Sequence, residues 1–81
     1  MKTYDITSRN LPETEGTVSI IGHGSEESVM LTDVSQCLTL HCITHMGNRI
    51  WRRSCRVTID GQSLKAAIEY GRLGGWKLVI L

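Results

Sequence analysis

The clearest alternation of hydrophobic and polar positions lies between residues 37 and 59, where two β-rich runs flank the dipeptide Gly47-Asn48. Because Gly-Asn suits a two-residue turn, this segment predicts a β-hairpin with Met46 opposite Arg49 and Leu40 opposite Cys55. Its apolar face collects Leu38, Leu40, Cys42, Trp51, Cys55, Val57 and Ile59. Its polar face collects Thr39, His41, Ile43, His45, Ile50, Arg52, Ser54, Arg56 and Thr58. Arg53 is the main misfit, because it falls on the apolar face and must reach an edge or find a partner there.

The residues that follow the hairpin predict a helix and then a strand. Asp60-Gly61 ends the second hairpin strand, and Ser63 is suited to cap a helix that runs to about Leu73. One stripe of that helix would contain Leu64, Ala67, Ile68 and Gly71. Gly74-Gly75 would end it, and the apolar residues 76–81 predict a buried strand. A strand, a helix and a strand with short links predict a right-handed crossover, with the last strand parallel to the second hairpin strand.

The N-terminal part predicts short strands around residues 4–6 and over 17–21, separated by a polar loop that contains Pro12. Residues 28–34 fit either a strand or a short helix, and the strand is favoured. The expected fold is therefore α+β: one domain over residues 1–81, with a mainly antiparallel sheet of four to five strands and one C-terminal helix packed on one face.

The composition is that of an ordinary globular chain, with 41% hydrophobic and 21% charged residues among 81. No apolar run approaches the roughly 20 residues that cross a bilayer, and the N-terminus lacks the apolar core of a signal peptide. Three cysteines without CxxC spacing predict free thiols in a reducing compartment. We therefore expect a complete cytoplasmic product.

Charge is distributed unevenly along the chain. Residues 1–36 hold two basic and six acidic residues, whereas residues 37–81 hold seven basic and two acidic ones. The candidate binding residues form a basic hairpin surface: His41, His45, Arg49, Arg52 and Arg56. Arginine forks there would suit phosphate oxygens. The competing interpretation is a solvated face whose arginines pair with the acidic N-terminal half, and the near-neutral total charge favours it.

No motif in the sequence predicts catalysis, a metal or a cofactor. Cys37, His41 and His45 have the spacing of a helical metal site, but on a strand the same spacing spans about 13 Å, too far for one ion. Cys42 and Cys55 fall on the apolar face, away from the histidines that would activate a nucleophile. Gly22-His23-Gly24-Ser25 lacks the lysine and the spacing of a phosphate loop.

The sequence thus predicts a small non-enzymatic binding module that uses the basic hairpin surface to engage nucleic acid or a nucleoprotein complex. Its size suggests an inhibitor or modulator of the kind that phages and mobile elements encode. The alternative is a protein–protein adaptor or inhibitor that makes no nucleic-acid contact and meets an acidic protein surface. An exposed last strand would also allow pairing in a homodimer.

Overall fold

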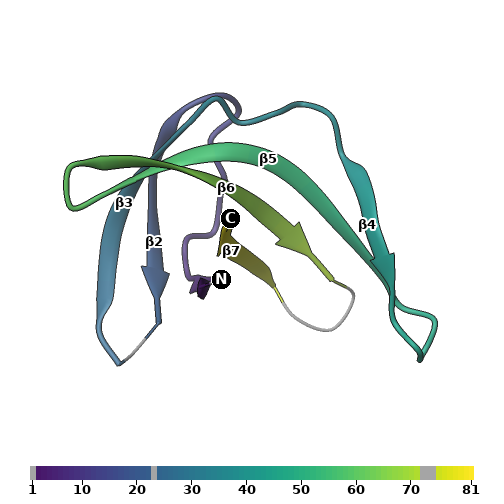
Figure 1. Cartoon of the computed structure of the whole chain (residues 1–81). Coiled ribbons are helices and arrows are strands. Elements are labelled where there is room, and N and C mark those ends of the chain that lie inside the picture. Colours follow the sequence, from purple (N-terminus) through teal and green to yellow (C-terminus); the bar gives the residue numbers. More distant parts are fainter. Residues whose placement is uncertain (1, 23, 72–74) are drawn as a thin grey trace.

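The computed structural model describes residues 2–22, 24–71 and 75–81, and all regular structure in them is β-strand (Figure 1). The seven strands are β1 (Lys2–Ile6), β2 (Gly16–Ile21), β3 (Glu26–Thr32), β4 (Thr39–Ile43), β5 (Arg49–Ile59), β6 (Gln62–Tyr70) and β7 (Trp76–Ile80). Every pairing is antiparallel, in the order β3-β2-β1-β7-β6-β5-β4. An additional pairing of β3 with β5 closes six of the strands into a barrel. The described residues contain no helix long and apolar enough to cross a membrane.

The long strand β5 joins the barrel to a projecting hairpin. One edge of β5 pairs with β6 from Trp51 to Ile59. Its other edge is divided, because β4 pairs with residues 49–52 and β3 pairs with residues 56–58. Figure 1 shows β4 on the far side of the view from β2 and β3. We call β4, the following turn and the first part of β5 (residues 39–52) the β4–β5 arm.

The core fills the barrel with side chains from alternate strand positions. Its buried members are Ile6, Val18, Ile20, Val29, Leu31, Val34, Cys55, Val57, Ala66, Ile68 and Leu78. Along β5 and β6 the inward set is odd-numbered on β5 and even-numbered on β6, because Cys55 lies opposite Ala66 and Val57 opposite Leu64. The outward set therefore includes Arg52, Arg56 and Glu69.

The predicted C-terminal helix is wrong, and with it the α+β fold class. Residues 62–70 form β6, which returns directly along β5 with Ile59 opposite Gln62. The turn between them is Asp60-Gly61, with φ values of 51° and 78°. Positive φ at both residues is the type I′ geometry that Asp-Gly favours, and this turn matches the twist of paired strands. Arg72, Leu73 and Gly74, which the predicted helix and its end also included, lie outside the described residues.

The last strand is also placed differently from the prediction. β7 pairs antiparallel with β6 and with β1, and no crossover joins it to β5. The predicted strands over residues 4–6 and 17–21 are confirmed as parts of β1 and β2. The favoured strand over residues 28–34 is confirmed by β3, which ends at Thr32.

The central hairpin exists, but its register differs from the predicted one. Ile43 lies opposite Arg49, so the turn contains residues 44–48 rather than Gly47-Asn48 alone. The Thr44 N–H donates to the Asn48 carbonyl at 2.8 Å and closes this longer turn. A bulge at His41, between the paired residues Leu40 and Cys42, then shifts the register again. Leu40 therefore stays on its predicted face but lies opposite Trp51 instead of Cys55, whereas Cys42 moves to the outer face opposite Ile50.

Candidate functional site

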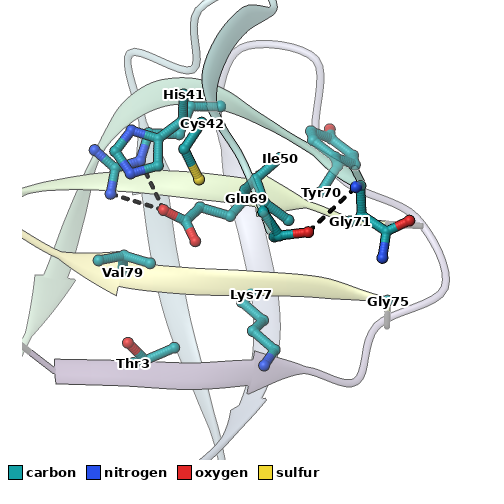
Figure 2. A pocket seen from close by; sticks show the side chains of 13 residues that line it. Thr3, His41, Cys42, Ile50, Glu69, Tyr70, Gly71, Gly75, Lys77 and Val79 are labelled. Carbon is teal, nitrogen blue, oxygen red and sulfur yellow. Dashed lines mark hydrogen bonds and ion pairs between the residues drawn. The ribbon is translucent and has the colours of Figure 1, made fainter. Parts of the chain in front are cut away.

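A groove of about 540 Å³ lies on the outer side of the barrel, between the β4–β5 arm and the wall formed by β6, β7 and β1 (Figure 2). Side chains of His41 and Cys42 border it from β4, Arg52 from β5 and Glu69 from β6. Its remaining lining residues are Thr3, Thr44, Asn48, Ile50, Tyr70, Gly71, Gly75, Lys77 and Val79. Figure 2 shows the Cys42 sulfur pointing into this groove.

Charges of alternating sign cross the wall of the groove in one row. Arg52 lies opposite Glu69, Glu69 opposite Lys77, and Lys77 opposite Asp5. The Arg52 Nε and Nη2 atoms both lie 2.7 Å from Glu69 Oε2, and the two side chains are about one-fifth exposed. Opposite charges directly across neighbouring strands stabilise a sheet. Stabilisation of the sheet is therefore a sufficient reason for the charged residues of this row.

The five predicted binding residues do not form one surface. Arg52 is paired with Glu69, and Arg56 donates to Ser63 Oγ at 2.9 Å and to the Ser63 carbonyl at 3.2 Å. His41 is the exposed bulge residue beside the groove, whereas His45 is exposed in the turn of the arm. Arg49 is exposed and belongs to the inward-facing set of β5, together with Trp51.

Arg53 lies on the core face of β5, as the alternation predicts, and it finds an aromatic partner there. Its guanidinium carbon is 5.8 Å from the centre of the Tyr70 ring, within cation–π distance. The Arg53 Nε atom is buried and has no hydrogen-bond partner among the described residues. Part of this guanidinium is therefore satisfied by a ring face rather than by a polar atom.

The arm carries a surface that the sequence prediction did not identify. All five residues of β4 are exposed, and the edge of β4 that faces away from β5 has no strand partner among residues 2–22, 24–71 and 75–81. The exposed large hydrophobic residues of this region are Leu38, Leu40, Ile43 and Met46. Residues 34–48 contain no Asp, Glu, Lys or Arg, and this charge-free run is the feature of the sequence that could have indicated the surface. The predicted hairpin places Leu38 and Leu40 on its apolar face, whereas both side chains are exposed.

The three cysteines are free and differ in their surroundings. Cys55 is buried in the core, and desolvation raises the pKa of its thiol to about 11. Cys37 and Cys42 are exposed, so the expected core position of Cys42 is wrong. In the part of the chain that the structure describes, no group of three His, Cys, Asp or Glu side chains is arranged to hold a metal ion.

No family model matches the chain, and neither a curated protein nor a solved structure matches it. The function therefore has to be argued from the surfaces of this barrel and of its arm.

Proposed function

We propose that the protein is a non-enzymatic binding module that holds a partner protein through the β4–β5 arm, as an adaptor or an inhibitor would. The observation that carries the proposal is the concentration of exposed apolar side chains on β4 and its flanks. Leu38, Leu40, Ile43 and Met46 are 44%, 43%, 57% and 75% exposed. Contiguous exposed apolar surface rimmed by polar groups is typical of protein interaction sites.

The open edge of β4 supplies the polar half of such a contact. Its outward N–H and C=O groups form a template on which an extended segment can add as another strand. Edge strands are usually protected against this by lysine, proline, inward charges, short length or bulges. β4, Thr-Leu-His-Cys-Ile, is short and bulged but contains no lysine, proline or inward charge. The bulge at His41 is its one irregularity. We therefore infer that the partner contributes an extended strand.

The chemistry of the arm indicates what that strand contains. The side chains of Leu40 and Ile43 lie on the face of the arm that bears Trp51 and Arg49, because these residues are opposite one another. Apolar side chains on alternate positions of an added strand would cover Leu40 and Ile43. Since β4 contains no Asp, Glu, Lys or Arg, the partner segment is expected to be apolar rather than acidic.

Nucleic acid is the second candidate partner, favoured by one specific arrangement. Arg56 lies directly opposite Lys65 on the outer face, and the residue on the other side of Arg56 is the uncharged Thr32. Two neighbouring cations without an acidic neighbour in that row would suit a phosphate backbone. Such binding would weaken steeply with salt, whereas burial of Leu40 and Ile43 would not.

Two variants with equally exposed hydrophobic residues test the proposal. Leu40 in β4 is 43% exposed and Met30 in β3 is 44% exposed, so Leu40→Glu and Met30→Glu change similar surfaces in different regions. A partner captured from host extract would be identified by mass spectrometry, purified, and titrated against both variants after nuclease treatment. We expect Leu40→Glu to weaken its binding at least tenfold and Met30→Glu to leave it unchanged.

Equal binding by the two variants would contradict the proposal. Capture that is lost after nuclease treatment, and that an Arg56→Glu and Lys65→Glu double variant also abolishes, would instead support the nucleic-acid candidate.

A further inference from the structure

A second hollow, of about 560 Å³, lies at the tip of the arm and shares the lining residues Asn48, Tyr70 and Gly71 with the outer groove. It is lined by Gly47, Asn48, Arg49, Trp51, Tyr70 and Gly71. Its volume falls in the range of roughly 300–1,000 Å³ that is typical of small-ligand sites. A Cβ added at Gly47 would meet no atom within 4 Å, so the turn leaves space at the rim.

Aromatic residues occupy neighbouring positions on three strands beside this hollow. Trp51 on β5 lies opposite Tyr70 on β6, and Tyr70 lies opposite Trp76 on β7. Tyr70 and Trp76 pack edge to face, with ring centres 6.0 Å apart and an interplanar angle of 80°, and both pack against the core. Trp51 is half-buried but is not among the residues that pack against the core. Packing against the core therefore does not explain why a tryptophan occupies position 51.

Positive charge flanks the rings on both sides. Arg49 and Arg53 are two residues before and two residues after Trp51 on the same face of β5. Arg49 is exposed, and Arg53 lies over the Tyr70 ring with its Nε atom lacking a hydrogen-bond partner among the described residues. The described residues that line this hollow include no acidic residue, in contrast to the outer groove, where Glu69 pairs with Arg52.

We propose that this hollow binds a nucleotide. A planar base would stack on the Trp51 and Tyr70 rings, and its phosphate would pair with the Arg49 guanidinium. The Asn48 side chain, which lines the same hollow, offers both a donor and an acceptor for the edge of the base. A free nucleotide and a nucleotide within a single strand present this same chemistry. The inference uses the inward face of β5 and β6, so it does not rest on partner binding along the edge of β4.

Isothermal titration calorimetry of the whole chain tests the site with four kinds of probe: the mononucleotides AMP and UMP, single-stranded oligonucleotides of increasing length, ribose 5-phosphate, and inorganic phosphate. We expect nucleotides to bind saturably and the two probes without a base to bind at least tenfold more weakly. Equal affinity for AMP and for an oligonucleotide would identify a free nucleotide as the ligand. Affinity that rises with length would identify single-stranded nucleic acid.

Variants then locate the binding. Arg49→Gln changes an exposed residue, and Trp51→Leu removes the stacking surface; each is expected to reduce nucleotide affinity about tenfold. Arg52→Gln, on the outer face, is the matched control and should leave affinity unchanged. Absence of saturable nucleotide binding, equal binding of inorganic phosphate, or unchanged binding by Arg49→Gln would each overturn the proposal. If Trp51→Leu fails to fold, the Arg49→Gln comparison decides alone.

Discussion

The barrel and the β4–β5 arm share strand β5 but differ in what their side chains do. In the second part of β5, Cys55 and Val57 are buried in the core, whereas β4 has no buried residue. The barrel satisfies both edges of its strands through closure, and the arm leaves one edge open. The difference indicates that the barrel residues hold the fold, and that the arm residues are available for contact with something else.

The largest expected difference between the two regions concerns truncation of isoleucine. Ile68 is fully buried in the barrel and Ile43 is 57% exposed in the arm. Ile68→Ala should lower the free energy of unfolding by about 2–5 kcal/mol, because it removes buried methyl groups and leaves a cavity. Ile43→Ala should change it by less than about 0.5 kcal/mol. Urea denaturation followed by tryptophan fluorescence measures both, and comparable losses would show that the arm is part of the cooperative core.

The pH dependence of stability compares a buried cysteine of the barrel, Cys55, with an exposed cysteine of the arm, Cys42. The folded-state pKa of Cys55, about 11, is raised above the value of 9.0 expected in the unfolded chain. The neutral thiol is therefore favoured by folding, so its contribution is fully present below pH 9 and is lost as the pH rises through 11. This loss should be on the order of 2–3 kcal/mol in the wild type and absent in Cys55→Ala. Denaturant titrations at several pH values measure it, with Cys42→Ala as the exposed control.

Two glycines at hairpin turns test whether the arm opens independently of the barrel. Gly61 and Gly47 have φ values of +78° and +84°, and an added Cβ would meet no atom within 4 Å at either position. The left-handed backbone should cost alanine about 1 kcal/mol in each turn. Because the arm can fray while the barrel stays closed, Gly47→Ala should lower global stability less than Gly61→Ala does. Thermal unfolding of both variants would show equal shifts if the arm and barrel unfold together.

The smallest expected effect belongs to the Arg52–Glu69 pair, at the base of the arm. Both side chains are about one-fifth exposed, so solvent screens their attraction. A double-mutant cycle with Arg52→Gln and Glu69→Gln should give a coupling of less than about 1 kcal/mol that decreases with salt. A coupling of several kcal/mol would show that this row of charges, rather than the apolar core alone, fixes the wall of the groove.

Strands were predicted correctly from the sequence where the pattern of residues suited a strand and not a helix. The β-branched run over residues 17–21 and the apolar run over residues 76–81 correspond to β2 and β7. The apolar residues over 63–70 fitted both a helix and a strand. Leu64 and Ile68 are four residues apart, a spacing that places them on one face of a helix and also on the inward face of a strand. The Asp60-Gly61 turn should have decided between them, since Asp-Gly after a β-rich run is a strong hairpin signal.

The candidate site was harder to predict because it depends on register and closure. A longer turn and a single extra residue at His41 put Cys42 on the outer face and Ile43 on the inner face. Whether Leu40 is covered depends on which strand lies beyond β4, and no local pattern contains that information. The pairing of Arg52 with Glu69 likewise required β6 to be a strand.

The contact between β1 and β7 has a consequence for how the chain reaches its fold. Lys2 pairs with Ile80, and Asp5 pairs with Lys77, so the barrel joins residues from opposite ends of the sequence. Contacts with such long sequence separation slow folding, and all-β chains of this kind typically fold in milliseconds to seconds. During synthesis, β1 has no partner on its β7 side until β7 has left the ribosome. The growing chain therefore exposes this edge of β1 until β7 has been made, and barrel closure is expected to follow the synthesis of β7.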